Sequence, residues 1–252
     1  MTDELHLSVI VPCYNEGENL RRGVLEELYV YLARQPWPYE VLISDDGSTD
    51  ASRELVGEYV RNRPQFRLLA NPHGGKPAAV WSGIQAACGN IVLFTDMDQS
   101  TPIDQWERLH PLFAQGYDVV IGSRGMGREN FPLYRRIGSG LFGGFRRLLL
   151  LHGIRDTQCG FKALRTSVAR EVFPLLEAIR RPTRVSGWRV TAFDVELLFL
   201  AEKRGHRIGE VPVTWADRDV ATGKGKSYWS ESREMAEQVL RVKLNDLRGL
   251  YD

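Results

Sequence analysis

Short apolar runs alternate with amphipathic segments along most of the chain. The runs are rich in β-branched residues and leucine, which predicts buried strands at 7–11, 39–44, 66–70, 91–94, 117–121 and 209–215. The segments between them repeat apolar residues at helical spacing, which predicts helices at 19–35, 51–61, within 71–87, and at 104–115, 167–178, 193–204 and 231–248. Because strand and helix alternate, the expected fold is α/β, with a Rossmann-like, mainly parallel sheet flanked by helices.

The length and composition fit one such domain with a helical tail. The chain has 252 residues, of which 43% are hydrophobic, and this is enough to bury a substantial core in one unit. We expect one domain over residues 1–230, followed by an amphipathic C-terminal helix within 231–252. We see no internal repeat or linker in the sequence.

Charge and cysteine content narrow the class of protein. The 33 basic and 32 acidic residues nearly cancel, so no overall charge points to nucleic acid as a partner. Arginines cluster at 135–136 and 146–147, and lysines at 224 and 226, which favours a bound phosphate over a polyanion. The three cysteines are widely spaced, without a metal-binding pattern or an even count for disulfides, and they fit a reducing cytosol.

The sequence contains no obvious targeting segment. The first predicted strand begins within a few residues of Met1, which leaves no room for a signal peptide. No apolar run reaches the length of a transmembrane helix. We therefore expect a cytoplasmic protein.

Candidate chemistry is concentrated where the strand at 91–94 ends. Asp96 and Asp98 follow this apolar run with one residue between them. Open α/β folds bind ligands at the carboxyl edge of the sheet, and two carboxylates there can hold a divalent cation against a diphosphate. The alternative is a solvated turn in which Asp98 or Ser100 caps a helix that begins near Pro102.

Neighbouring strands favour the ligand site. The strand at 39–44 also ends in acids, Asp45 and Asp46, and capping of the next helix by Ser48 or Asp50 leaves this pair unexplained. The first predicted strand is followed by a polar loop, so several strands bring polar or acidic loops to one edge. The chain contains neither the G-x-G-x-x-G loop of dinucleotide enzymes nor a Walker sequence, which argues against both classes.

Residues 134–152 form a separate feature. The segment combines glycines, four arginines and a run of leucines at 148–151, so it is too basic for a core helix and too short for a membrane span. One interpretation is a helix at a membrane surface, with its arginines directed to lipid headgroups. The other is a helix packed on the domain with solvated arginines.

Short motifs follow one another in order along the chain. They are P-C-Y-N-E at 12–16, D-D-G-S-T-D at 45–50, G-G-K-P-A-A at 74–79, D-M-D at 96–98, G-S-R at 122–124, D-T-Q-C-G-F-K at 156–162, F-D-V-E-L-L at 193–198, E-V-P-V at 210–213 and G-K-G-K at 223–226. Together they resemble the family 2 glycosyltransferases of GT-A fold, specifically the polyprenyl-phosphate sugar synthases, over nearly the whole chain. The motifs at 156–162 and 193–198 look most like those of dolichyl-phosphate glucose synthases.

The resemblance implies a nucleotide-sugar donor, which points to UDP-glucose, with GDP-mannose as the alternative. The donor-binding residues that it implies are Pro12, Tyr14, Glu16, Asp45, Asp46, Lys76 and Asp96. Asp96 and Asp98 would carry Mg²⁺ or Mn²⁺ on the donor diphosphate. Such a metal neutralises the charge that grows on the leaving group without any proton transfer.

The resemblance also implies that the acceptor is a polyprenyl phosphate. A phosphate monoester is already nucleophilic at neutral pH, so groups that position it matter more than a strong base. The implied phosphate-binding residues are Arg135, Ser139, Arg218 and Lys226. The catalytic candidates are Asp98, Arg124, Asp156 and Asp194. Asp156 and Asp194 would orient the sugar or the attacking oxygen, and direct attack would invert the anomeric carbon.

The chain departs from the family pattern at several positions. Met97 stands where D-A-D has alanine, Ser100 where some relatives have a metal-ligating glutamine, and Gly225 where the basic loop usually has serine. The transmembrane helices that relatives often carry after the last helix are missing from this sequence, so we expect peripheral contact with the cytosolic face of a membrane. A GT-A enzyme with a soluble acceptor, and a nucleotide-sugar-binding protein without activity, are the alternatives.

Overall fold

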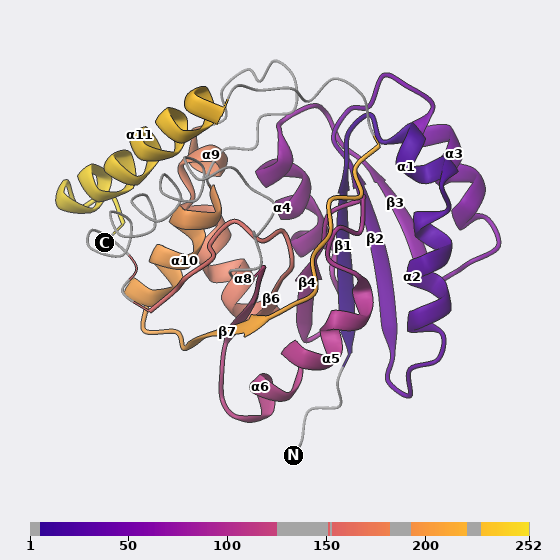
Figure 1. Ribbon diagram of the computed structural model, residues 1–252, viewed down its shortest axis with the longest axis horizontal. Coiled ribbons are helices and arrows are strands. Elements are labelled where there is room, and N and C mark those ends of the chain that lie inside the picture. Colours follow the sequence, from indigo (N-terminus) through magenta and orange to yellow (C-terminus); the bar gives the residue numbers. More distant parts are fainter. Residues whose placement is uncertain (1–5, 125–150, 152, 182–192, 221–227, 252) are drawn as a thin grey trace.

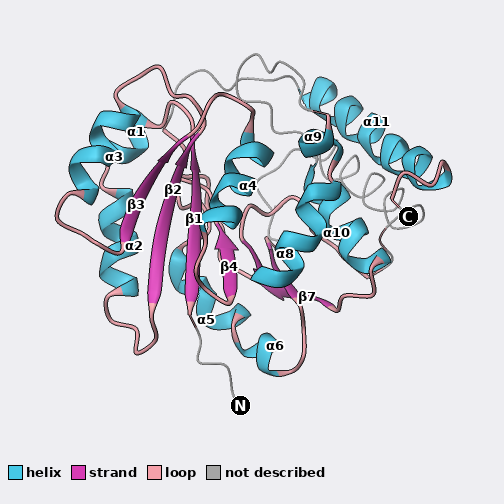
Figure 2. Cartoon of the chain, turned by 180° about the vertical axis from the view of Figure 1, so that it is seen from behind, coloured by secondary structure: helices cyan, strands magenta, loops and turns pink. Residues whose placement is uncertain are grey.

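The computed structural model describes residues 6–124, 151, 153–181, 193–220 and 228–251. In this part of the chain, helices cover both faces of a central seven-stranded sheet (Figure 1, Figure 2). The expected α/β class with a mainly parallel sheet is confirmed.

The strands are arranged in the order β3-β2-β1-β4-β6-β5-β7. Their bounds are β1 Leu7–Cys13, β2 Tyr39–Asp45, β3 Phe66–Ala70, β4 Ile91–Phe94, β5 Val119–Ser123, β6 Lys162–Arg165 and β7 Ile208–Pro212. Strands β3, β2, β1 and β4 run parallel, and β5 runs parallel to β7. The sequence predicts β3 and β4 with these same bounds, and the other parallel strands with ends displaced by a few residues.

Strand β6 is absent from the sequence-based prediction. It runs antiparallel to both of its neighbours, with Phe94 of β4 and Ile121 of β5 each paired with Lys162. Its sequence, K-A-L-R, has a charged residue at each end, so no apolar run marks it as a strand. Because β6 is reversed, its beginning lies at the edge where the parallel strands end.

The helices lie on both faces of the sheet. Their bounds are α1 Gly17–Arg21, α2 Val24–Leu32, α3 Ser52–Val60, α4 Lys76–Ala86, α5 Trp106–Leu109, α6 Pro111–Ala114, α8 Thr166–Val172, α9 Glu177–Arg180, α10 Phe193–Lys203 and α11 Tyr228–Leu247. Strand residues alternate between two cores. On one face Ile10 packs with residues of α4, α8 and α10, and on the other Val9 packs with residues of α2, α5 and α6.

Several predicted helices are divided in the structure. The helix predicted at 19–35 forms α1 and α2, separated at Gly23, whose φ of 88° is unfavourable for residues with a side chain. The helix predicted at 104–115 forms a short 3₁₀ turn followed by α5 and α6, and Pro111 begins α6. Pro174 lies in the 3₁₀ turn between α8 and α9. Periodicity therefore located these helices but not their breaks.

The C-terminal helix α11 packs against α10 (Figure 2). Val239 and Val242 on α11 join the domain core, and the chain then turns back at Gly249, where φ is 68°. The predicted boundary at residue 230 stays a prediction. Among the described residues, no helix has both the length and the apolar character that a bilayer span needs.

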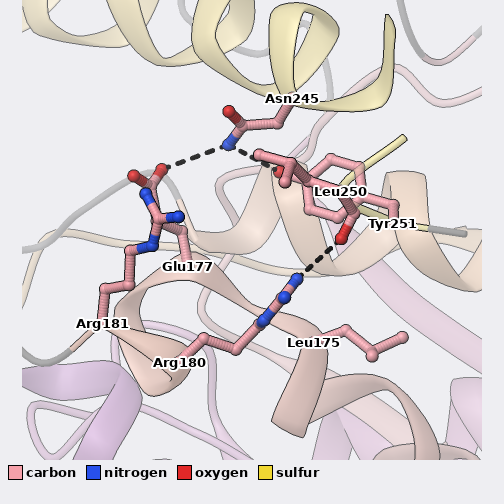
Figure 3. Close-up of a pocket in the computed structure, with 7 residues that line it drawn as sticks. All are labelled: Leu175, Glu177, Arg180, Arg181, Asn245, Leu250 and Tyr251. Carbon is pink, nitrogen blue, oxygen red and sulfur yellow. Dashed lines mark hydrogen bonds between the residues drawn. The ribbon is translucent and has the colours of Figure 1, made fainter. Parts of the chain in front are cut away.

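The end of the chain is fastened to α9 and α10. Figure 3 shows Asn245 between Glu177 and Tyr251, and its amide donates to the Glu177 carboxylate at 3.4 Å and to the Tyr251 hydroxyl at 3.3 Å. Arg180 donates to the carbonyl oxygen of Leu250 at 2.6 Å. These contacts anchor the turn after α11.

Residues 134–150 and 152 lie outside the described residues, so both interpretations of the segment 134–152 stay predictions.

Candidate active site

The polar loops predicted to converge lie along one edge of the sheet. Parallel pairing puts Cys13 opposite Asp45 and Ile10 opposite Phe94, so the loops that follow β1, β2 and β4 are neighbours. The reversed strand β6 begins at this edge and brings the preceding segment 156–161 to it. Ligands of parallel sheets bind at such an edge.

The D-M-D turn follows β4. Met97 is buried in the core, whereas Asp96 and Asp98 are partly exposed. The backbone N–H of Ser100 donates to Oδ1 of Asp98 at 2.8 Å. Burial, and then the nearby charge of Asp96, raise the pKa of Asp98. The helix cap considered as an alternative does not form, because the 3₁₀ turn after Pro102 has no side-chain cap.

Lys76, the first residue of α4, pairs with Asp96. Its Nζ lies 2.5 Å from Oδ1 of Asp96. Burial acts to lower the pKa of Lys76, but the carboxylates of Asp96 and Asp194 prevail and the pKa is raised. The preceding residue, Gly75, donates its N–H to Asp46 at 2.9 Å. One loop therefore links the acids after β2 to the acids after β4.

Arg124 and Asp156 form a bidentate ion pair. Arg124 Nε lies 2.8 Å from Oδ2 of Asp156 and Nη2 lies 2.9 Å from Oδ1, and the Arg124 backbone N–H also donates to Oδ2. Burial opposes ionisation, but the hydrogen bonds and charge of Arg124 hold the pKa of Asp156 well below its usual range. Glu210 of β7 accepts the Asp156 backbone N–H at 2.7 Å. The pair is charged at neutral pH and fixed in orientation.

Asp194, in the first turn of α10, pairs with Lys162 at the start of β6. Lys162 Nζ lies 2.6 Å from Oδ1 of Asp194, and the lysine is fully buried. Lys162 Nζ also donates to the carbonyl oxygen of Cys159. Although Lys162 lies in the D-T-Q-C-G-F-K motif, it was not among the predicted site residues. Its charge compensates Asp194, which favours an orienting role for this carboxylate over that of a proton acceptor.

Asp45 and Asp46 are enclosed by the protein. Both side chains are 0% exposed. Asp45 accepts from Nε of Arg53 at 2.5 Å and from backbone N–H groups of the turn that follows. Asp46 accepts from the N–H groups of Gly74 and Gly75, and burial raises its pKa against their influence. Direct contact of either carboxylate with a nucleoside stays a prediction.

The loop after β1 contains the remaining predicted donor residues. Pro12 lies within β1, and Glu16 is buried and accepts from the Asn19 amide at 2.6 Å. The ring of Tyr14 stacks on the imidazole of His73, with centroids 4.6 Å apart. The sequence did not single out His73, because a lone histidine before a glycine motif has no distinctive pattern. Only the fold brings it to Tyr14.

The loop after β7 reaches the D-M-D turn and α2. Arg218 pairs with both carboxylate oxygens of Glu27, at 3.0 and 2.8 Å. Arg22 donates to the carbonyl oxygen of Asp98 at 2.6 Å and to that of Arg218, which ties the loop to the turn. The other predicted phosphate-binding residues, which lie outside the described residues, are Arg135, Ser139 and Lys226.

The chemistry of the D-M-D turn suits a hard divalent cation. Asp96 and Asp98 supply carboxylate oxygens, which Mg²⁺ and Mn²⁺ prefer. No group of three or more His, Cys, Asp or Glu side chains in the described ranges could hold a metal. Mg²⁺ is, however, commonly bound by one or two carboxylates together with substrate phosphates. The two aspartates therefore fit a cation that binds with a diphosphate.

Residues 8–173 match the family described as Glycosyl transferase family 2. The chain belongs to this family. A dolichyl-phosphate beta-glucosyltransferase from Dictyostelium discoideum is 34% identical to this glycosyltransferase, over 99% of this chain and 77% of its own length. Another from Trichomonas vaginalis, ALG5C, is 33% identical over 98% of this chain and 74% of its own length. The expected family is confirmed.

Solved structures share the fold of this glycosyltransferase. Mannosyl-3-phosphoglycerate synthase from Rubrobacter xylanophilus superposes with a TM-score of 0.64 at 15% identity, covering 98% of this chain and 76% of that one. Glucosyl-3-phosphoglycerate synthase from Mycobacterium tuberculosis, in complex with Mn²⁺, UDP and glucosyl-3-phosphoglycerate, gives 0.61 at 19% identity, with 96% and 79% covered. At these identities the likeness concerns the fold alone, and it confirms the expected GT-A class.

Proposed function

We propose that this glycosyltransferase moves glucose from UDP-glucose to a polyprenyl phosphate, with a divalent cation held by Asp96 and Asp98. The observation that carries the proposal is the similarity, along almost the whole chain, to dolichyl-phosphate beta-glucosyltransferases. That similarity extends beyond the donor half to the segments that contain Asp156 and Asp194. The products would be UDP and a glucosyl ester of the lipid phosphate.

Positive groups gather where the donor diphosphate would leave. A bound cation would neutralise the charge that develops on the departing diphosphate. Lys76, whose raised pKa keeps it charged at neutral pH, lies against Asp96 and is the protein's own cation at this position. Arg22 brings a guanidinium group to the backbone of Asp98. The donor diphosphate would therefore bind at a turn with two carboxylates for the metal, Asp96 and Asp98, and with positive side chains fixed beside it.

The acceptor side needs positioning more than base catalysis. A phosphate oxygen of the lipid attacks the anomeric carbon, the bond from that carbon to the diphosphate breaks, and the configuration inverts. Asp156 and Asp194, paired with Arg124 and Lys162, would orient the sugar and the attacking oxygen. The residues that we propose to bind the acceptor phosphate are Arg135, Ser139, Arg218 and Lys226.

A lipid acceptor requires contact with a membrane, and α11 has a suitable surface. Among the side chains of α11 that the structure describes, the large exposed apolar ones are Leu240, Leu244 and Leu247. On the same helix the basic side chain of Arg241 is exposed and that of Lys243 is partly exposed. An apolar stripe accompanied by basic residues is typical of a helix that lies in a membrane interface. We propose that α11, together with the segment 134–152, rests on the cytosolic leaflet.

The test is formation of a lipid-linked product. Purified protein incubated with labelled UDP-glucose, Mn²⁺ and polyprenyl phosphate should give butanol-extractable label, and a metal chelator should abolish it. Asp96→Asn and Asp98→Asn should each reduce the rate by about a hundredfold or more. Asp104→Asn, which changes an exposed acid beyond the turn, is the matched control and should retain the rate. No labelled lipid from any sugar nucleotide would refute the proposal.

The same assay separates the alternatives. Label from GDP-mannose but not from UDP-glucose would identify a mannosyltransferase. An enzyme with a soluble acceptor would turn over without lipid and would need a base, so Asp194→Asn would then impair it far more than Arg135→Ala. For a lipid phosphate acceptor we expect Arg135→Ala to be at least as harmful.

A further inference from the structure

The Asp46 side chain is fully buried in the protein. Its Oδ1 accepts the N–H of Gly74 at 2.8 Å, and its Oδ2 accepts the N–H of Gly75 at 2.9 Å. Oδ2 also lies 2.8 Å from Nδ1 of His73. Three donors inside the protein therefore hold this buried carboxylate, and any of them can pass its influence to a ligand.

Of these three donors, only the imidazole of His73 is a side-chain group. Its imidazole stacks on the Tyr14 ring, with the two planes inclined by only 16°. The turn at Gly47, where φ is 77°, packs against it so closely that a Cβ there would lie 3.0 Å from the Cβ of His73. A carboxylate, an aromatic ring and a glycine turn therefore fix the orientation of the imidazole.

The second ring nitrogen of His73, Nε2, is buried and makes no hydrogen bond with any of the described residues. Nδ1 faces the Asp46 carboxylate, and in the tautomer that keeps the ring proton on Nδ1 the other nitrogen, Nε2, is an acceptor. A buried acceptor without a donor is unfavourable. The site is complete once a ligand supplies an N–H group.

We propose that His73 reads the base of the nucleotide donor, with its Nε2 accepting the N3–H of uracil while Tyr14 packs beside the base. The inference rests on the proposed function. The loop that contains His73 continues to Lys76, which lies against Asp96. The group that recognises the base and the turn that holds the diphosphate are therefore joined by a few residues of one loop.

This hydrogen bond distinguishes classes of base. Uracil has an N–H group at position 3, and guanine and thymine have a comparable imino N–H. Cytosine and adenine have an acceptor nitrogen there instead, which would face the acceptor Nε2 of His73. A site that hydrogen-bonds one ligand group rejects an analogue that lacks it, because the protein's own polar group is then left unpaired.

The test compares UDP with 3-methyl-UDP, in which a methyl group replaces the N3 hydrogen. Calorimetry with Mn²⁺ should show that the wild-type chain binds UDP at least about tenfold more tightly than 3-methyl-UDP. His73→Phe keeps a ring to stack on Tyr14 but removes both nitrogens. We expect it to bind UDP about tenfold more weakly and to bind the two nucleotides within about twofold of each other. His206→Phe, outside the site, is the matched control and should keep the wild-type preference.

The outcomes separate this inference from the proposed function. If His73→Phe keeps the wild-type preference for UDP over 3-methyl-UDP, His73 does not read the base, and the proposed transfer reaction is unaffected. If the wild-type chain binds no uridine nucleotide, the proposed donor is wrong and this inference falls with it. A merely structural role would weaken both nucleotides equally in His73→Phe and preserve their ratio, which would also overturn the inference.

Discussion

A Cβ atom on Gly160 would lie 1.9 Å from Oδ2 of Asp96. Gly160 lies two residues before β6, and its backbone packs against the carboxylate of Asp96. The other oxygen of that carboxylate, Oδ1, lies 2.5 Å from Nζ of Lys76. The partly exposed carboxylate of Asp96 therefore lies between an ammonium group and a glycine. Its orientation depends on both, which explains a requirement for glycine in the D-T-Q-C-G-F-K motif.

Gly160→Ala should displace Asp96 and impair transfer. The clash can be relieved only by moving the carboxylate or the β6 backbone, and misplacement of a reacting group by about 1 Å can cost about a hundredfold in rate. The measurement is kcat and KM for UDP-glucose, together with the affinity for UDP in the presence of Mn²⁺. Gly153→Ala, where a new Cβ meets nothing within 4 Å, is the matched control. Equal activity of the two variants would show that Asp96 does not need its present position.

Arg22→Met should weaken nucleotide binding through the D-M-D turn. Arg22 joins the backbone of Asp98 to that of Arg218, and its loss frees the turn and the loop after β7 from each other. Hydrogen bonds from a charged group contribute about 1.5–3 kcal/mol each, so we expect at least about a tenfold rise in the Kd for UDP with Mn²⁺.

The neighbouring arginine provides the control for this prediction. Arg21 forms an exposed pair with Glu18, and such pairs contribute little, so Arg21→Met should change the Kd by less than about twofold. Arg22→Lys should recover only part of the loss, because one ammonium group lacks the planar fork that spans two carbonyl oxygens. Full recovery by lysine would mean that charge alone matters here.

The sequence predicted most of the fold because the parallel strands contain short apolar runs. Ile91–Phe94 is an example, and no tertiary partner is needed to identify it. β6 shows the limit of this approach. Lys162 can be buried in a strand only because Asp194 from a distant helix lies beside it, and a local pattern contains no information about that partner.

The site was predicted in part for a similar reason. Acids that follow parallel strands must meet at one edge, so the proximity of Asp46 and Asp96 follows from topology. Topology does not show whether these carboxylates are already hydrogen-bonded within the protein. Asp46 accepts hydrogen bonds from Gly74 and Gly75, and Asp45 accepts one from Arg53. These donors belong to loops and helices whose placement the sequence does not determine.

Asp156→Asn should destabilise the protein in a pH-dependent way. The folded pKa of Asp156 lies well below 3.8, so its ionised form contributes stability that is complete above about pH 4 and is lost as the pH falls through the folded pKa. We expect a loss of about 3 kcal/mol at pH 7, because Arg124 is left without its partner. Urea unfolding at pH 7, 5 and 3.5 should show the same loss at pH 7 and 5 and a smaller one at pH 3.5.

A surface pair supplies the comparison for Asp156. Glu18→Gln removes the exposed pair with Arg21 and should change the unfolding free energy by less than about 1 kcal/mol at each pH. A loss in Asp156→Asn that stays constant down to pH 3.5 would mean that the ionised pair is not its source.

Tyr251→Phe should also destabilise the protein, with the opposite dependence on pH. The Tyr251 hydroxyl donates to the buried carboxylate of Glu196 at 2.7 Å. Burial raises the folded pKa of Glu196 above 4.5, so stability falls as the pH rises from 4.5 through the folded pKa. Without the hydroxyl the folded pKa rises further, and the fall is larger.

We therefore expect Tyr251→Phe to cost about 1–2 kcal/mol in urea unfolding at pH 8 and less at pH 5, where more of Glu196 is protonated. Tyr29→Phe is the control, because the variant keeps the ring that packs edge-on against Phe66, and its effect should be small at both pH values. The ring of Tyr251 remains in the variant, so its packing against Phe199 is retained. A loss that is equal at pH 5 and pH 8 would assign the effect to packing at the end of α11 and exclude the hydrogen bond to Glu196 as its cause.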